Sequence, residues 1–535
     1  MTCSFCNALV WKGEAIGRPT HSSRKLFTIC CQQGRVKLPP VKEPPSPLKE
    51  LIDTPTYRKH NRLLNSLLAF TSMGAKIDHT VTGTPGPFTF RVHGQNHHRM
   101  GSLFPADGKP PQFLQLYIYD TANEVENRMK SMSRGESKVK VDEKILEQLI
   151  KMLDLNNHLA QTFRHARDRY ESGTGEEFNI RLISQKQRGR QYDLPSADEI
   201  ASLIVGDFNL HSGQRDVVVQ FKSLSLQMIS DLHPLFMSLQ YPLLFPYGET
   251  GYHPQIPYCP TVESRVKRET MTMREFYSYQ LQTRMTEGMI LIKSGRLLHQ
   301  YIVDAYTATE QERLRFVILN QKKLRADLYN NICDALDRGD TDAKSIGTRV
   351  ILPSSFTAGP QYMSEKYHDA IAICRWFGNP HLFITVTANP NWDEISEHLE
   401  KYGGESANSR PDLEVRAFKL RLDELMRDFK VGTFFPIPEA VVYTIEFQKR
   451  GLPHAHILLW FRGFTQEATP SIIDHYISAE IPDRETDREG FDLVQRHMIH
   501  GPCGDSRKSS PCMEKGKCTK NFPKPFAQET SIDKS

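Results

Sequence analysis

Two neighbouring segments near residue 450 constrain the fold of this chain more than any other feature. Residues 440–448 (AVVYTIEFQ) and 454–461 (HAHILLWF) are rich in β-branched and aromatic side chains, and the short segment KRGLP separates them. This pattern predicts two strands joined as a β-hairpin. Because side chains alternate between the faces of a strand, His454 and His456 share one face, and the apolar residues between and after them share the other.

The polar face of this hairpin predicts a metal site. If Gln448 lies opposite His454, then Glu446 lies opposite His456, and all four side chains share one face. Two imidazoles with a carboxylate or amide oxygen form a three-ligand, open-sided site for a divalent cation, and either Glu446 or Gln448 could be the third ligand. An ion there would polarise a scissile phosphate. The alternative is a pair of ordinary histidines on a half-buried sheet, because a bare H-x-H motif has many chance matches.

Cysteines near the N-terminus predict a structural zinc site. Cys3 and Cys6 form a CxxC pair, and Cys30 and Cys31 follow in a short segment with little regular periodicity. A segment this short folds around a metal more readily than around a core of its own. Two adjacent cysteines are not expected to bind one ion comfortably, so His21 is a candidate for the fourth ligand. The alternative is a set of small buried cysteines.

A second group of metal-ligand residue types lies near the C-terminus. The segment HMIHGPCGDSRKSSPCMEKGKC contains His500, Cys503, Cys512 and Cys518. It is too polar to fold around its own core, which favours zinc, but its spacing fits no standard zinc finger closely. A second zinc site and a set of unligated side chains both remain open. The nearby lysines would contact DNA phosphates or remain ordinary solvated charges.

The overall charge does not by itself indicate a nucleic-acid partner, since 68 Lys and Arg face 63 Asp and Glu. Basic residues gather in the helical segment RLRFVILNQKKLRADLY, where the candidates for phosphate contacts are Arg313, Lys322, Lys323 and Arg325. A solvated helix face is an equal alternative. No run of about 18 apolar residues exists, so no membrane span is expected. No GxxxxGK[ST] motif occurs either, so no nucleotide triphosphate is expected to bind.

Many separated motifs resemble those of plant-type Helitron transposases. EFQKRGLPHAHILLW resembles the histidine–hydrophobic–histidine motif of the HUH endonucleases, and CSFCNALVWKGE with FTICCQQGRVKLPP resembles the N-terminal cysteine motif of Helitrons. Other stretches between about residue 232 and the end agree, namely LPSSFTAGPQYM, DAIAICRWFGNPHLFITVTANPNWDEI, ISAEIP, HGPCG, SPCM and GKCTKNFPK.

The resemblance implies a domain that nicks and joins single-stranded DNA at transposon ends in rolling-circle transposition, in the nucleus. It implies Mg²⁺ or Mn²⁺ at His454 and His456. It also implies that FITVT is a strand packed beside the histidine strand, with Thr385 and Thr387 near the DNA.

The resemblance further implies a nucleophile that this sequence does not contain. Helitrons use two tyrosines, with three residues between them, on one helical face after the histidine motif. None of the 19 tyrosines has another four positions on, and Tyr476 alone follows His456. Tyr476 does not match the nucleophile motif, and a packing role suits it better. We therefore expect a chain that stops before the tyrosine helix and the helicase domain. The alternatives are a non-catalytic DNA-binding module derived from a Helitron and, with less support, a zinc hydrolase.

The expected architecture is α+β. It has a central antiparallel, RRM-like sheet of HUH type flanked by helices, preceded by a small zinc module and a mixed α/β DNA-binding region. The expected segments are a zinc module at 1–36, a proline-rich linker at 37–50, a mixed α/β region at 51–231, a Helitron helicase-like domain at 232–465 and a Cys/Lys-rich tail at 466–535. Periodicity predicts helices over about 145–163, within 274–337 and over 411–429, and a strand over 381–387.

Overall fold

The structure is a computed structural model, and it forms two compact units. Unit 1 comprises Met1–Glu365, Val386–Asp423 and Ile445–Ala455, and unit 2 comprises Lys366–Thr385, Glu424–Thr444 and His456–Ser535. The structure describes the whole chain outside residues 17–24, 79–89, 94–95, 133–140, 173–177, 183–200, 206–216, 220–225, 261–267, 322–351, 403–405, 449–450, 463–468, 478–479, 511 and 533–535.

Several helices of unit 1 begin at caps that the sequence encodes. Helix α2 (Pro55–Leu68) follows Thr54, whose side chain accepts a backbone hydrogen bond from the first turn, and a proline occupies its first position. Helix α8 (Met273–Gln280) begins with a capping box in which Thr272 and Glu275 satisfy each other's backbone N–H groups.

Two helices replace the one predicted around residues 145–163. Helix α4 (Glu143–Asn156) and helix α5 (His158–Glu171) are separated by Asn157, which is extended and caps α5 by accepting two backbone N–H groups. The single-helix prediction is therefore wrong at Asn157, a residue type that favours caps over helix interiors. The apolar spacing was informative on either side of the break, since Leu149 before it and Phe163 after it are both fully buried.

The helical region predicted within residues 274–337 is present in part. After α8 come the short helix α9 (Ile290–Lys293) and the long helix α10 (Gly295–Leu319). The end of the predicted region, with Lys322, Lys323 and Arg325, lies outside the described residues.

One hydrophobic core joins segments of unit 1 that are far apart in the sequence. It contains Leu297 and Tyr301 of α10, Phe163 of α5, and also Val10 and Phe27 from the cysteine-rich N-terminal segment. The N-terminal segment is thus packed into the main core. The predicted domain boundaries remain predictions.

A buried polar network ties α10 to the strand β4 (His98–Met100). His98 is fully buried, and its Nε2 lies 2.6 Å from Asp304 Oδ2 while its Nδ1 lies 3.0 Å from the carbonyl oxygen of Phe236. The Asp304 carboxylate also accepts hydrogen bonds from the Tyr241 hydroxyl at 2.9 Å and the Asn96 amide at 2.7 Å. Each oxygen of Asp304 therefore has a partner, as a buried carboxylate requires.

The strands form small sheets. Unit 1 holds three-stranded sheets of order β1-β4-β8 and β6-β5-β7 and the pair β2-β3, all with antiparallel pairings. Their bounds are β1 Ser72–Met73, β2 Lys76–Ile77, β3 Val92–His93, β5 Phe178–Leu182, β6 Ala201–Val205, β7 Val217–Val219 and β8 Gln227–Ile229. The remaining helices here are α1 Leu48–Leu51, α3 Glu124–Met132 and α7 Phe236–Gln240, with short 3-10 helices at Lys12–Glu14, Phe113–Tyr117, Thr121–Asn123 and Ala407–Ser409.

The three strands around the histidine motif are confirmed. They are β9 (Leu382–Thr387), β10 (Pro438–Phe447) and β11 (Pro453–Phe461), in the order β10-β11-β9 with the histidine strand in the centre. Backbone N–H groups of His381 and Ala388 donate to the carbonyls of Leu459 and Pro453 respectively, so β9 is antiparallel to β11. The division between the two units crosses all three strands.

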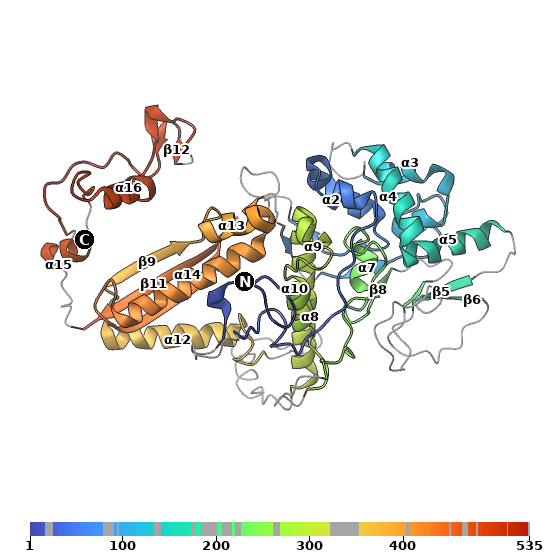
Figure 1. The fold of residues 1–535 in the computed structure, drawn as a ribbon, viewed down its shortest axis with the longest axis horizontal. Helices are drawn as coiled ribbons and strands as arrows, with labels where there is room; N and C mark the ends of the chain where they lie inside the picture. The colour runs from blue at the N-terminus through green and yellow to red at the C-terminus, as the bar shows by residue number, and fades with distance from the viewer. Residues whose placement is uncertain are drawn as a thin grey trace, which may run out of the picture. The chain divides into compact units, whose positions relative to one another are not determined.

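Two long helices accompany this sheet. Helix α14 (Pro411–Val431) confirms the helix predicted over 411–429, and its residues Phe418, Leu422 and Phe429 are buried. Helix α12 (Pro360–Phe377) precedes β9 in the chain (Figure 1). Helix α13 (Asp393–Tyr402) follows β9. The fold is therefore mixed α+β, as predicted, and its sheets are small and antiparallel.

The C-terminal part of unit 2 has short elements only. They are α15 Pro470–Tyr476, α16 Arg488–His497, a 3-10 helix at Gly504–Ser506, β12 Met513–Glu514 and β13 Lys517–Cys518. Over the described residues, none of the helices combines the length and the apolar character needed to cross a membrane.

Replacement of Asp304 by alanine is expected to destabilise the protein strongly, because it leaves His98 and Tyr241 buried without their acceptor. Breaking a buried pair of this kind costs about 3–5 kcal/mol. Removing the exposed Asp369 from its ion pair with Lys366 should cost at most about 1 kcal/mol. Urea unfolding of Asp304→Ala and the control Asp369→Ala measures both, and equal midpoints would contradict the role assigned to this network.

Candidate metal centres

The four N-terminal cysteines form one compact cluster. The Sγ atoms of Cys3, Cys6, Cys30 and Cys31 all lie within 4.8 Å of one another. Cys3 Sγ is 3.7 Å from Cys31 Sγ, and Cys30 Sγ is 3.8 Å from Cys31 Sγ. A tetrahedral zinc ion with Zn–S bonds of about 2.3 Å separates its sulfurs by about 3.8 Å. The donor set and its spacing therefore fit a structural zinc ion.

Both adjacent cysteines belong to this cluster, although two neighbouring cysteines were not expected to bind one ion comfortably. Just after them, Gln32, Gln33 and Gly34 all have positive φ angles, and the chain turns back on itself. The backbone N–H of Gly34 lies 3.2 Å from Cys31 Sγ. The cluster thus supplies four thiols by itself. The other candidate ligand, His21, lies outside the described residues.

Arg284 is a member of this site that sequence reasoning missed. The side chain is buried, and its Nε donates to the carbonyl oxygen of Cys6 at 3.0 Å while Nη2 lies 3.8 Å from Cys6 Sγ. Its Nη1 donates to the Tyr279 carbonyl at 2.8 Å, and the guanidinium stacks 3.6 Å from the centroid of the Tyr279 ring. Hydrogen bonds with Cys30 and Cys31, together with the nearby Arg284 charge, lower the pKa of Cys6.

The charge of Arg284 matters because four thiolates around one Zn²⁺ carry a net charge of about −2. A buried charge is costly unless a counter-charge is close. Partners in the second shell of a metal site also orient the ligands and tune their affinity. Arg284 lies 278 positions from Cys6 in sequence, and no local pattern in the sequence marks the pair.

Further contacts fix the N-terminal segment to unit 1. The backbone N–H of Leu9 donates to the carbonyl of Thr283 at 2.8 Å. Arg416 of α14 forms two hydrogen bonds to the carboxylate of Glu14, at 2.6 and 2.7 Å. The cysteine cluster is thus attached to both the segment after α8 and helix α14.

The second cluster is also assembled, although its spacing matched no standard finger. Ligand atoms of His500, Cys503, Cys512 and Cys518 all lie within 4.8 Å of one another. The hairpin β12–β13 positions Cys518, and its two-residue turn has positive φ at both Lys515 and Gly516.

The side chains of the second cluster have contacts that favour metal binding. The ring of His500 stacks on Phe522 with centroids 4.1 Å apart, and its Nε2 is 3.3 Å from Cys518 Sγ. Backbone hydrogen bonding, first from Phe522, lowers the pKa of Cys518 to about 6. This shift favours the thiolate, which is the form that binds metal. The set of one imidazole and three thiols fits zinc.

The histidine strand has the predicted alternation. His454 and His456 are partly exposed, whereas Ala455, Ile457 and Leu459 between and after them are fully buried. The side-chain periodicity of β11 thus separates a polar face from a core face.

Strand β9 contributes partners to both histidines. Thr387 Oγ1 lies 2.5 Å from His454 Nδ1, and Phe383 stacks on His456 with centroids 5.4 Å apart. Phe383, Thr385 and Thr387 alternate as the exposed residues of β9. Thr387 is therefore beside the histidine strand, and Thr385 shares its face of β9.

The hairpin register differs from the prediction by two residues. The N–H of Gln448 donates to the carbonyl of Leu452 at 3.0 Å, and the N–H of Gly451 donates to the carbonyl of Gln448 at 2.8 Å. Gln448 therefore pairs with Leu452, and stepping back along the antiparallel strands places Glu446 opposite His454. The predicted pairing of Gln448 with His454 is wrong.

The cause is the turn, where Gly451 adopts φ +85° as an added left-handed residue, a bulge that shifts the pairing. A shift of the strand register by two residues keeps every side chain on the same face of the sheet. Glu446 and Gln448 therefore remain on the face that carries His454 and His456. In the described part of the chain, the groups whose ligand atoms gather within 4.8 Å are the two cysteine clusters. The histidine face is more open.

Two further residues considered in the sequence analysis have partners of their own. Arg313 pairs with Glu310 at 2.6 Å, and its guanidinium lies 4.4 Å from the Phe356 ring centroid. Tyr476 packs near Phe435, with ring centroids 6.2 Å apart, and edge-on to His475.

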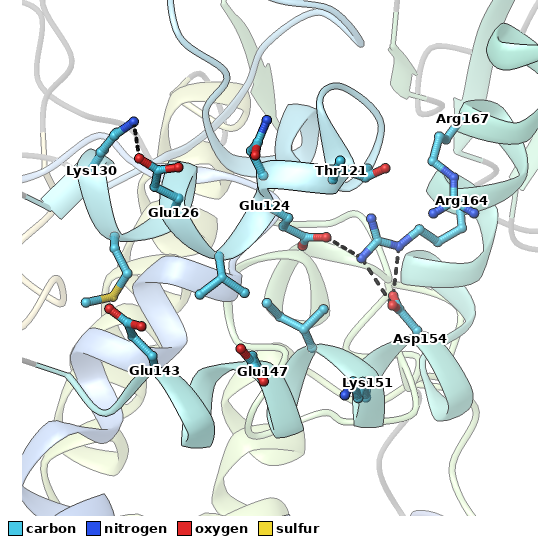
Figure 2. A pocket seen from close by; sticks show the side chains of 15 residues that line it. Thr121, Glu124, Glu126, Lys130, Glu143, Glu147, Lys151, Asp154, Arg164 and Arg167 are labelled. Atoms are coloured by element: carbon cyan, nitrogen blue, oxygen red, sulfur yellow. Dashed lines mark hydrogen bonds and ion pairs between the residues drawn. The ribbon is translucent and has the colours of Figure 1, made fainter.

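A large pocket of about 930 Å³ lies between α3, α4 and α5 (Figure 2). Charges of both signs line it, including Glu143, Glu147 and Lys151. Arg164 at its edge is engaged by Glu124 at 2.7 Å and Asp154 at 2.9 Å. The mixture of charges selects neither an anion nor a cation, so this pocket is not a candidate site.

Comparison with known families adds one match. Residues 276–459 match the family described as the Helitron helicase-like domain at the N-terminus. The matched segment runs from α8 to β11, so it contains Arg284, His454 and His456, whereas both cysteine clusters lie outside it. No curated protein matches the chain.

The purified chain is expected to hold about two zinc ions, one for each four-ligand cluster. Cys6→Ser and Cys512→Ser should each remove about one ion. Arg284→Met should retain both ions but weaken zinc binding at the first cluster by about 10- to 100-fold, the usual effect of losing a second-shell partner. Metal analysis gives the counts, and competition with a chromogenic chelator gives the affinities. If Arg284→Met competes with the chelator as the wild type does, Arg284 does not contribute to zinc binding.

Proposed function

We propose that residues 276–459, which match the Helitron helicase-like domain, belong to a metal-dependent endonuclease that nicks and joins single-stranded DNA in rolling-circle transposition. The observation that carries the proposal is the histidine pair on one face of the central strand β11, inside the family match. The antiparallel order β10-β11-β9 supports a sheet of the HUH, RRM-like type.

In this proposal His454, His456 and Glu446 hold a divalent ion, with Gln448 as the alternative third ligand. The contact of Thr387 with Nδ1 of His454 orients the ring and makes Nε2 the ligand atom. Glu446 is favoured over Gln448 because the register places it directly opposite His454. The donor set suits Mn²⁺ and, with more water ligands, Mg²⁺. The bound ion would polarise the scissile phosphate.

The DNA partner is proposed to be a single-stranded transposon end, encountered in the nucleus. Thr385 and the exposed residue Phe383 lie on the histidine side of β9, where an unpaired base could stack on the aromatic ring. Four exposed lysines near the second cluster would contact DNA phosphates. They are Lys515, Lys517, Lys520 and Lys524.

The tyrosine content favours a second candidate, a DNA-binding module without covalent chemistry. None of the 19 tyrosines has another four positions on, so this sequence lacks the spaced pair. Tyr476 is the one tyrosine after the histidine strand, and it contacts Phe435 and His475. Binding of DNA by these residues does not require a nucleophile.

The histidine face is expected to bind Mn²⁺. Titration of the intact chain should show a site that the double variant His454→Ala, His456→Ala loses, because both imidazoles are proposed ligands. The control His165→Ala removes an exposed histidine of α5 and should bind as the wild type does. Equal binding by the double variant and the control would disprove the metal site. The zinc clusters are saturated before the titration so that they do not compete.

No covalent link between this chain and DNA is expected. A phosphotyrosine bond needs a hydroxyl aligned with the phosphate at about 3–3.5 Å, and the spaced pair is missing from the sequence. The chain is incubated with Mn²⁺ and a labelled single-stranded Helitron end, then separated on a denaturing gel. A labelled band at the protein's mass would contradict the expectation. If it vanished in Tyr476→Phe, that residue would be the nucleophile.

A further inference from the structure

A small pocket lies where the N-terminal segment meets helix α13. It has a volume of about 190 Å³, and its aromatic lining consists of Trp11, His398 and Tyr402. The ring centroids of Trp11 and His398 are 6.0 Å apart, and those of His398 and Tyr402 are 5.0 Å apart, each pair tilted by 56°. Neither of these ring pairs is stacked, so the rings do not close the pocket by packing face to face.

His398 has a buried polar atom for which the described residues provide no hydrogen-bond partner. The residue is 8% exposed, and the atom is its Nε2. Burial, with a smaller contribution from Arg410, lowers the pKa of His398 to about 4. The ring is thus neutral at pH 7, and its Nε2 either donates or accepts depending on the tautomer. A buried polar atom of this kind is normally satisfied, so the pocket lacks one hydrogen-bonding group.

Two cations already face the rings. The guanidinium of Arg416 lies 4.7 Å from the Trp11 ring centroid, and Lys401 Nζ lies 5.4 Å from that of Tyr402. Glu394 and Glu397 also line the pocket, so its lining carries charges of both signs and selects neither an anion nor a cation. A neutral, flat ligand with polar edges suits this lining better.

The volume limits the ligand to about one ring. A protein cavity of about 150 Å³ holds one benzene molecule. Pockets for drug-sized ligands measure about 300–1,000 Å³. At about 190 Å³, this pocket accepts a six-membered ring with its substituents more readily than a fused double ring.

We infer that the pocket formed by Trp11, His398 and Tyr402 binds a single pyrimidine base of single-stranded DNA. This inference rests on the proposed function, which supplies the DNA. Pyrimidine edges carry both donors and acceptors, so either tautomer of His398 finds a partner. The aromatic rings contact the faces of the base. Lys401 is exposed at the rim, where the phosphate of the same nucleotide would pass.

The test measures binding of the full chain to labelled oligo-dT, oligo-dC and oligo-dA of equal length by fluorescence anisotropy. The wild type is expected to prefer the pyrimidine strands. His398→Phe keeps an aromatic ring but removes the hydrogen bond, so it should weaken pyrimidine binding about two- to ten-fold and reduce the preference. The matched control His165→Phe changes an exposed histidine on α5 and should behave as the wild type does.

A variant at the surface provides a second test in case the buried substitution His398→Phe prevents folding. Lys401→Gln alters an exposed side chain, so it leaves the core intact and should weaken binding while lowering its salt dependence. If all variants bind like the wild type and no strand is preferred, the pocket inference is overturned while DNA binding stands.

Free mononucleotides separate the pocket from the proposed function. Saturation-transfer NMR with dTMP, dCMP and dAMP should show contact for the two pyrimidines, and the signal should be lost in His398→Phe. If no oligonucleotide binds but dTMP still contacts the wild type through His398, the pocket stands and the DNA-binding proposal fails. Binding of tetramethylammonium but not of dTMP would mark a cation cage and overturn the pyrimidine assignment.

Discussion

The buried guanidinium of Arg284 is the interaction on which the arrangement of unit 1 most depends. It contacts the carbonyl and sulfur of Cys6, 278 positions earlier in the chain, and stacks on Tyr279. This one cation therefore offsets part of the negative charge that a zinc-loaded cysteine cluster would carry, and it holds the N-terminal segment against the family-matched domain. Losing the metal would leave four thiols beside a buried positive charge, so zinc loss is expected to loosen the whole interface.

The position of Trp11 follows from this attachment. Trp11 lies only a few residues beyond Cys6, and Arg416 both covers its ring and binds Glu14. The pocket around His398 is thus built jointly by the N-terminal segment, which lies outside the family match, and helix α13, which lies inside it. A base held there would connect zinc-dependent folding of the N-terminal segment to recognition of DNA.

The two proposed zinc sites differ from the proposed Mn²⁺ or Mg²⁺ site in how many ligands the protein provides. Both cysteine clusters bring four ligands within 4.8 Å of one another, which closes the coordination shell and suits an ion that stabilises structure. The histidine face offers fewer protein ligands on an accessible side of the sheet, with Thr387 orienting one ring from the neighbouring strand. An open shell of this kind leaves positions for a phosphate oxygen, as metal-assisted phosphodiester chemistry requires.

Local sequence patterns determined several elements of this protein. Alternation predicted the strands β9, β10 and β11 and the shared face of His454 and His456, and helical periodicity predicted α14, because each repeat is set by backbone geometry within a few residues. The two cysteine clusters were also evident from residue types. The tertiary structure alone decided the hairpin register, which depends on the left-handed conformation of Gly451, and the placement of both Cys30 and Cys31 in one cluster. It alone brought Arg284 to Cys6 and Trp11 to His398, because contacts between residues hundreds of positions apart arise from packing and leave no periodic trace in the sequence.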